Sequence, residues 1–374
     1  MSPTAETPEP RTPDLLYSET EEDLRAAVRG LLADRGDLAR VAVRAEEGDP
    51  YDPELWKALA ADMGVAGLLV PEELGGQGAS HREAAVVLEE LGRAMAPAPY
   101  LTSAVVATEV LLGCDTGRPD VAGLLGALAS GRRTAALVAP FTAGPDDVTL
   151  RPGPDGVLAG VADAATADVL LVPTAAGLYA VERTGEGVSV TPQIPLDLTR
   201  PLAEVALAGA AGTLLADGGT ARAAVRGGLL AGAGLLASEQ LGLAEWCLAE
   251  TVRHTKERHQ FNRPIGSFQA LKHRMAQLWL EVVSARAAAR NAADALAAGS
   301  TEAPLAAALA QAYCGRVAVH AAEECVQLHG GTGMTWEHPA HIYLKRAKAD
   351  SLALGSSGAH REAVGRLVGL PVPD

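Results

Sequence analysis

The sequence predicts an α+β fold in three parts: an N-terminal α-helical domain, a small middle β domain and a C-terminal four-helix bundle. Both ends of the chain are rich in Ala, Leu and Glu, with apolar residues at three-to-four spacing, whereas residues 133–222 are short Val/Leu runs broken by Gly, Pro and Asp. A chain of 374 residues also exceeds the size at which one core stops growing. We therefore expect a flexible tail and three domains, with boundaries at 1–17, 18–132, 133–222 and 223–370.

The first helix is expected to begin at Ser18. Met1–Leu15 has four prolines before Asp14 and little apolar content, which is typical of a flexible tail. Ser18 can cap a helix, and the acidic residues that follow suit the positive end of the helix dipole. The buried stripe of this helix is expected to be Leu24, Val28, Leu31 and Leu32.

The rest of the N-terminal domain is expected to be helical, with one ambiguous segment. Met63–Gly78 is a short apolar run followed by a Gly-rich turn, which could form a strand and hairpin in an α/β protein. The expected helices are Pro53–Met63, Ser80–Ala94, Pro97–Leu112 and Val121–Ala129.

Six short runs predict the strands of the middle domain, because Val and Leu alternate with turn residues there. From about Ala223 the chain is expected to be helical nearly to its end. The predicted strands are Ala135–Val138, Gly156–Leu158, Val169–Val172, Leu178–Val181, Val188–Thr191 and Ala203–Leu207.

Composition excludes several classes of protein. The net charge is −15 and no basic stripe appears, which argues against a nucleic-acid partner. The four cysteines show no CxxC or His-Cys clustering, so we expect neither a metal site nor a disulfide framework. The N-terminus lacks the pattern of a signal peptide, and no apolar run is long enough to span a membrane. We expect a cytoplasmic protein that is not bound to membranes.

A short segment between two long helical patterns, Arg258–Gln269, concentrates functional side chains. It reads Arg-His-Gln-Phe-Asn-Arg-Pro-Ile-Gly-Ser-Phe-Gln and holds two of the three phenylalanines in the chain. Its Pro and Gly predict a tight connection between helices. Taken alone, the segment could be a packed connection with solvated arginines or part of a binding site.

Three motifs in order give the chain a resemblance to the acyl-CoA dehydrogenases. Arg258–Gln269 resembles the signature of the C-terminal domain, and Gln327-Leu-His-Gly-Gly-Thr-Gly333 follows at the distance usual for the family. Thr335–Arg346 resembles the actinobacterial branch, which includes heteromeric subunits without the catalytic Glu. The resemblance implies the predicted order of domains, and it makes Met63–Gly78 a linker within the helical domain.

The resemblance also implies one half of an FAD site. Members of the family build each site from two subunits, with the pyrophosphate and adenosine end held by the C-terminal helices of one of them. Arg258 matches the arginine that pairs with the pyrophosphate, a role suited to its planar, permanently charged fork. The matching residues are Arg258, Gln260, Phe261, Gln269, Gln327, Gly330, Gly331 and Gly333.

The other half departs from the family pattern. Ala139–Asp147 keeps only fragments of the family's Thr-Glu-Pro-x-x-Gly-Ser-Asp stretch, and Val161–Val172 lacks its Trp. The family places its catalytic Glu at one of two positions, which here are Leu354 and about Gly232. The catalytic residue is therefore unknown from the sequence.

Other chemically active side chains are interpreted as structural. Glu239, Glu337 and Asp350 are interpreted as exposed helix carboxylates, and the Lys345, Arg346 and Lys348 run as a solvated helix face. His338-x-x-His341 lacks the spacing of a zinc motif. The histidines interpreted as structural or at a ligand edge are His329, His338, His341 and His360.

The resemblance implies a flavoprotein oxidoreductase of lipid metabolism that uses FAD to introduce an α,β double bond into an acyl-CoA thioester. The half-kept site favours a subunit that lends its adenosine half to a second acyl-CoA dehydrogenase-like subunit with a catalytic Glu. Alternatives are a self-sufficient flavoenzyme of altered chemistry in secondary metabolism and a non-catalytic acyl-binding or scaffold protein. We expect a hetero-oligomer, or a homo-oligomer, that associates through the Ala-rich faces of residues 270–298 and 302–326.

Overall fold

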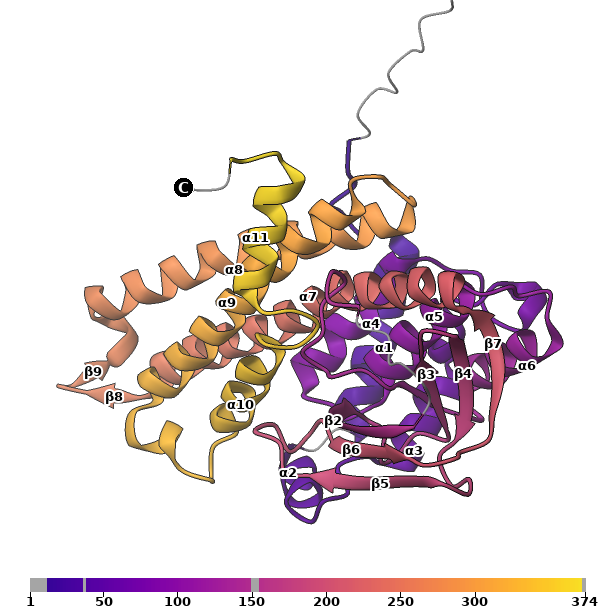
Figure 1. Ribbon diagram of the computed structural model, residues 1–374. Coiled ribbons are helices and arrows are strands. Elements are labelled where there is room, and N and C mark those ends of the chain that lie inside the picture. Colours follow the sequence, from indigo (N-terminus) through magenta and orange to yellow (C-terminus); the bar gives the residue numbers. More distant parts are fainter. Residues whose placement is uncertain (1–11, 36–37, 149–154, 372–374) are drawn as a thin grey trace, which may run out of the picture.

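A computed structural model describes residues 12–35, 38–148 and 155–371 of the chain. It has N-terminal helices, two small sheets and long C-terminal helices in that order, so the predicted fold class is confirmed (Figure 1). Most of the predicted flexible tail, residues 1–11, lies outside the described residues.

The N-terminal helices begin where their capping residues predict. The hydroxyl of Ser18 accepts a hydrogen bond from the Glu21 N–H at 3.3 Å, and the Ser18 N–H donates to the Glu21 carboxylate at 2.5 Å. Ser80 and Glu83 make the same reciprocal cap at the next long helix. The α-helices are α1 (Glu19–Arg35), α2 (Leu38–Glu46), α3 (Pro53–Lys57), α4 (His81–Ala94), α5 (Thr108–Leu112) and α6 (Pro119–Ala129).

Two predicted helices are partly π-helical, and α2 was not predicted. The turns widen over Ala58–Asp62, after α3, and over Tyr100–Ala107, before α5. Met63–Gly78 contains two single 3₁₀ turns, Val65–Gly67 and Glu72–Leu74, and no strand. The strand and hairpin reading of this segment is therefore wrong, and the linker reading agrees with the structure.

The middle of the chain forms two sheets. One has the order β1-β3-β4-β7 and the other β2-β6-β5, and all pairs are antiparallel except β1 with β3. Side chains from both sheets share one core that includes Leu170, Val172, Val161 and Val205. β7 was not predicted. The strands are β1 (Ala135–Leu137), β2 (Gly156–Ala162), β3 (Val169–Pro173), β4 (Gly177–Glu182), β5 (Val188–Gln193), β6 (Leu202–Leu207) and β7 (Gly212–Asp217).

The C-terminal region is built around one helix of 40 residues, α7, which is about 60 Å long at 1.5 Å per residue. Alanines of α7, α8, α9 and α10 fill a common core. The Ala-rich faces that were expected at a subunit interface are thus largely buried against other helices of the same chain. The elements are α7 (Gly218–Glu257), β8 (His259–Gln260), β9 (Arg263–Pro264), α8 (Gln269–Ala297), α9 (Ala303–His329), α10 (Ala340–Asp350) and α11 (Ser357–Leu367).

A buried cluster of ion pairs connects the sheet domain to the C-terminal helices. Arg200, in the segment before β6, contacts Glu239 of α7 at 2.7 Å and Asp350 of α10 at 2.6 Å. Arg346 of α10 contacts Glu239 at 2.5 Å and also pairs with Asp197. Each ion pair joins residues far apart in the sequence, so the cluster fixes how α10 and the sheet domain meet α7.

This cluster corrects part of the sequence interpretation. Glu239 and Asp350 are 2% and 0% exposed, so they are not exposed carboxylates, although Glu337 is. Arg346 is likewise buried, whereas the neighbouring Lys348 is a half-exposed partner of Glu323. Charged residues at helical spacing look solvated in a sequence, and here the opposite charges that bury them lie on other elements.

Across the described part of the chain, no helix is long and apolar enough to cross a membrane.

Candidate cofactor and active site

Arg258 follows the last residue of α7 and stands at the base of the small β8–β9 hairpin. Its N–H donates to the carbonyl of His254 at 2.8 Å, and its carbonyl accepts from the N–H of Ile265 at 2.8 Å. Phe261 and Asn262 form the tip of the hairpin with positive φ angles of 52° and 62°. The hairpin projects at the far end of the molecule from the two sheets (Figure 1). The backbone of Arg258 is fixed by these hydrogen bonds while its side chain stays exposed.

An open cleft of about 580 Å³ lies between this hairpin and the end of α9. Its volume is in the range of small-molecule sites. Arg258 has no ion-pair partner among the residues that the structure describes, so its charge is available to a ligand. The lining residues are His254, Arg258, Gln260, Ile265, Leu271, Arg274, Gln327, Leu328, His329, Gly330, Gly331 and Thr332.

Five of the eight sequence-predicted cofactor residues line this cleft, and three do not. Phe261 lies at the exposed hairpin tip, 85% exposed, and Gln269 is the exposed first residue of α8. Gly333 is buried beneath the turn. The cleft brings together the predicted residues Arg258, Gln260, Gln327, Gly330 and Gly331.

Two glycines of the turn after α9 are required for different physical reasons. Gly330 adopts φ 61° and ψ −137°, a conformation that residues with a Cβ rarely take, and a Cβ there would meet open space. A Cβ at Gly333 would lie 2.5 Å from the carbonyl oxygen of Val326. Gly330 therefore shapes the cleft, and Gly333 lets the turn pack on the end of α9.

The two positions at which the family carries its base meet in space. A Cβ at Gly232 of α7 would lie 3.1 Å from Cδ1 of Leu354 and 2.6 Å from Cγ2 of Val106. Leu354 has a positive φ of 52°, which costs a residue with a side chain about 1–3 kcal/mol. The side chain of Leu354 therefore points toward Gly232, and neither of these two positions carries a carboxylate.

Little space remains around Leu354. The small cavity that it lines with Thr102, Phe141 and Leu229 has a volume of about 30 Å³. The N–H of Leu354 donates to the carbonyl of Phe141 at 2.7 Å, and that of Gly355 to the carbonyl of Thr142 at 3.2 Å. These bonds join the segment after β1 directly to the base position, and the cavity they leave holds about one or two waters rather than a ring.

A buried carboxyl group that the sequence analysis missed lies close by. Asp163, at the end of β2, is 2% exposed, and burial raises its pKa. One of its oxygens accepts a hydrogen bond from Tyr51 and the other from Thr102, which also lines the small cavity. Both oxygens are therefore used between the helical domain and the sheets, and Asp163 does not take the place of the missing base.

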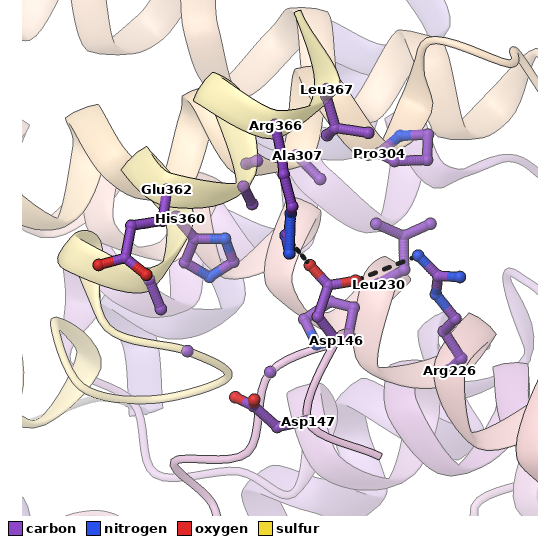
Figure 2. Close-up of a pocket in the computed structure, with 16 residues that line it drawn as sticks. Asp146, Asp147, Arg226, Leu230, Pro304, Ala307, His360, Glu362, Arg366 and Leu367 are labelled. Carbon is purple, nitrogen blue, oxygen red and sulfur yellow. Dashed lines mark hydrogen bonds and ion pairs between the residues drawn. The ribbon is translucent and has the colours of Figure 1, made fainter. Parts of the chain in front are cut away.

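A second cleft, of about 370 Å³, opens on the other side of the Leu354 loop, where Gly355 and His360 line it (Figure 2). Asp146 lies across it between two arginines, 3.1 Å from Arg226 of α7 and 2.6 Å from Arg366 of α11. Sequence analysis did not identify this cleft because its charges come from three separate segments.

Comparison with known proteins places the chain in a family. Two protein-family models match the chain. Residues 18–115 match the model for the acyl-CoA dehydrogenase N-terminal domain, and residues 219–369 match the model for the acyl-CoA dehydrogenase C-terminal domain. The chain is 37% identical over 340 residues to acyl-CoA dehydrogenase IpdE2 of Mycolicibacterium smegmatis, which covers 90% of this chain and 95% of that protein.

Solved structures with the same fold include complexes of acyl-CoA dehydrogenase-like chains. The fold matches the ChsE4–ChsE5 complex from Mycobacterium tuberculosis with a TM-score of 0.83 at 27% identity, over 96% of this chain and 100% of that chain. It matches the Tcur3481–Tcur3483 steroid ACAD with a TM-score of 0.82 at 28% identity, over 94% and 98%.

The fold and the sequence comparisons together define the class of protein. The chain belongs to the acyl-CoA dehydrogenase family, whose members are FAD-dependent flavoproteins that act on acyl-CoA in lipid metabolism. The cleft at Arg258 fits the pyrophosphate end of FAD, because an unpaired guanidinium and an open glycine turn face it. The cavity at Leu354 does not fit the flavin ring.

Proposed function

We propose that this chain is a subunit of a heteromeric acyl-CoA dehydrogenase that lends its adenosine and pyrophosphate half-site to a partner. The observation that supports this is a distance along one helix. Twenty-six residues separate Gly232 from Arg258, which is about 39 Å at 1.5 Å per residue. We expect a bound dinucleotide to be shorter than that, which favours an Arg258 cleft that serves the flavin site of another subunit.

The chemistry of the family defines what the partner must supply. Bound FAD would supply the hydride acceptor for the acyl Cβ, and the protein must then provide a carboxylate for the α-proton and hydrogen bonds to the thioester enolate. This chain has no carboxylate at Leu354 or Gly232, and the cavity that Leu354 lines has a volume of only about 30 Å³. The partner therefore supplies the base and the flavin-ring pocket, and Arg258 with the Gly330 turn holds the other end.

Two solved relatives support a heteromeric assembly. One is a complex of ChsE4 with ChsE5, and the other pairs Tcur3481 with Tcur3483 as a steroid acyl-CoA dehydrogenase. An acyl-CoA with a fused-ring acyl group therefore belongs beside straight and branched acyl groups in any substrate panel. The missing carboxylate at both base positions disfavours the self-sufficient alternative, and the open Arg258 cleft disfavours the scaffold alternative.

The test is the flavin content of the complex. The chain is co-expressed with the acyl-CoA dehydrogenase-like chain encoded beside it, and protein mass and flavin absorbance are measured on the purified assembly. We expect equal numbers of the two chains, in a two-plus-two assembly, with one FAD for every two chains. A homo-oligomer of this chain with one FAD per chain would contradict the proposal.

A second measurement separates the alternatives. Mixed anaerobically with acyl-CoA thioesters, the chain alone should leave any bound flavin oxidised, and the co-expressed complex should bleach. Bleaching by the chain alone would support a self-sufficient flavoenzyme. Absence of flavin from both preparations would support the acyl-binding or scaffold alternative.

A further inference from the structure

We propose that Glu250, His329 and His338 form a binding site for one divalent transition-metal ion of the zinc class. The three residues come from α7, the last turn of α9 and the segment before α10. One ligand atom from each lies within 4.8 Å of the other two. The site borders the cofactor cleft, because His329 lines both. Sequence spacing predicted no metal site, since no two of these ligands are close in the sequence.

The distances suit a tetrahedral ion. Oε1 of Glu250 lies 3.6 Å from Nε2 of His329 and 3.4 Å from Nε2 of His338. Zinc–ligand bonds of 2.0–2.2 Å in a tetrahedron imply a spacing of about 3.3–3.6 Å between ligand atoms. Two imidazoles and one carboxylate are a common zinc donor set, and they leave one coordination position for water or a ligand.

His329 is already oriented for this role. Its Nδ1 donates to the carbonyl oxygen of Cys325 at 2.7 Å, which leaves Nε2 as the atom with the free lone pair. The residue is 5% exposed, and Nε2 is buried without a hydrogen-bond partner among the described residues. A lone pair that faces a carboxylate oxygen is repelled unless a cation lies between them, which a metal ion at this position supplies.

Two of the proposed ligands already have hydrogen-bond partners that a metal ion would have to displace. Arg253 holds Glu250 through both carboxylate oxygens, and this hydrogen-bonded pairing lowers the pKa of Glu250 to about 2, so the ligand is always ionised. Arg253 is half-exposed and can turn to solvent. Nδ1 of His338 accepts from the Ala340 N–H at 3.2 Å, and metal binding at Nε2 would move the ring proton to Nδ1 and break that hydrogen bond.

A proton is the other cation that could occupy the position. Burial lowers the pKa of His329, but its hydrogen bonds to Cys325 and the charge of Glu250 outweigh this and raise the pKa. The rings of His254 and His338 each have their centroid 4.1 Å from that of His329, and burial together with the charges of His329 and His338 lowers the pKa of His254. Metal and proton therefore compete, and the metal is favoured at neutral and higher pH.

The ion would fasten three elements beneath the cofactor cleft. Glu250 lies two turns before Arg258 on α7, and His329 immediately precedes the Gly330 turn. A bound ion fixes the spacing between the arginine and the glycine turn. Its role is therefore to position the cleft, and it has no part in the reaction at the acyl group.

The test measures metal content directly on the full chain, purified without a histidine tag. The protein is stripped with a chelator, dialysed with Zn²⁺ or Co²⁺ at pH 7.5 and analysed by elemental mass spectrometry and by the visible absorption of Co²⁺. We expect one ion per chain and the intense Co²⁺ bands of a tetrahedral site. Glu250→Gln and His338→Gln should each weaken binding at least about tenfold.

The matched control is the pair His320 and Glu281, whose atoms lie 2.7 Å apart; Glu324 lies 3.8 Å from the other ring nitrogen of His320, so the two carboxylates face different nitrogens and no three ligand atoms of the described residues converge there. Glu281→Gln should bind metal as the wild type does. Thermal unfolding of the metal-free variants shows whether each one folds. Wild-type protein that retains well under one ion per chain, or folded Glu250→Gln that binds as tightly as the wild type, would overturn the proposal and leave the position to a proton.

Discussion

Arg258 is the residue on whose charge the proposed cofactor site depends most directly. Its backbone is held on both sides, by His254 and Ile265, while its guanidinium has no ion-pair partner among the described residues. The free protein therefore needs no rearrangement to offer a planar, charge-assisted donor to a pyrophosphate. Other arginines of the region are already engaged, as Arg274 is with Glu324.

Replacement of Arg258 by Ala should release FAD from the complex. The loss of a hydrogen-bonded charge pair costs about 1.5–3 kcal/mol, which is tenfold or more in affinity. The measurement is FAD affinity by fluorescence during dilution of the co-expressed complex. Arg263→Ala is the control, because Arg263 lies on the same hairpin but packs over Phe268 instead of lining the cleft. Equal FAD loss in both variants would contradict the assignment.

The charge cluster at α10 gives a prediction about pH. Three carboxylates face two guanidiniums, and burial together with the charge of Glu239 raises the pKa of Asp350 to about 7. A carboxyl group with a raised pKa stabilises the folded state below its unfolded pKa, and this contribution is lost as the pH rises through about 7. The free energy of unfolding should therefore fall between pH 4 and 7 because of Asp350.

Asp350→Asn should remove that decline, and Glu239→Gln should be far more damaging. Glu239 accepts hydrogen bonds from both Arg200 and Arg346, so its loss leaves buried N–H groups of two guanidiniums without an acceptor, which costs about 1–3 kcal/mol or more. Urea unfolding of the wild type and both variants from pH 4 to 8 gives the comparison. A wild-type minus Asp350→Asn difference that does not change with pH would refute the assignment of the titration to Asp350.

At the scale of elements, α7 links every site in the molecule. It carries Arg226 beside the second cleft, Gly232 at the base position, Glu239 in the charge cluster and Glu250 near its end, and it leads directly into Arg258. Its residues face different neighbours along a length of about 60 Å. Glycine occurs on α7 both where a neighbouring element packs closely and where the helix is exposed. Substituting one glycine of each kind tests how closely the neighbours pack.

Gly232→Ala should destabilise the protein and Gly227→Ala should stabilise it. A Cβ at Gly232 would enter the space of Val106 and Leu354, and such overpacking costs about 1–3 kcal/mol. Gly227 lies on the same helix and is exposed, and a Cβ added there would meet no atom within 4 Å, so Ala gains about 0.5–1 kcal/mol. Denaturant unfolding measures both. Stabilisation of both variants to the same extent would show that Gly232 is not closely packed.

Sequence reasoning succeeded for elements with strong local signals. Helices capped by Ser18 or Ser80 and strands flanked by Gly and Pro were found because caps, turns and periodicity act within a few residues. The short α2 and the edge strand β7 were missed. Burial of Glu239, Asp350 and Arg346 was missed because it depends on partners far away in the sequence, on other elements. The motifs located the Arg258 cleft, whereas the Glu250 cluster has no spacing to recognise.

At the scale of the whole molecule, exposed large apolar side chains occur on several faces, and one group of them lies on α8 and after the glycine turn, close to the Arg258 cleft. Trp279 and Leu280 on the outer side of α8 are 58% and 54% exposed, and Met334 and Trp336 after the glycine turn are 77% and 71% exposed. Large apolar side chains are enriched at protein interfaces. The Ala-rich faces of α8 and α9 pack within the chain, so these larger side chains are the ones available to a partner.

Trp279→Glu should separate this chain from its partner without unfolding it. A charge placed in an apolar interface is desolvated without a counter-charge, while on the free subunit the position is exposed and the substitution should change stability by less than about 0.5 kcal/mol. Size-exclusion chromatography with light scattering should show separate subunits, and the flavin should be lost with them because the adenosine half is supplied across the interface. Val43→Glu on α2, 55% exposed in the N-terminal domain, is the matched control and should keep both assembly and flavin. Loss of assembly with full retention of FAD by either separated chain would show that the cofactor site is complete within one subunit.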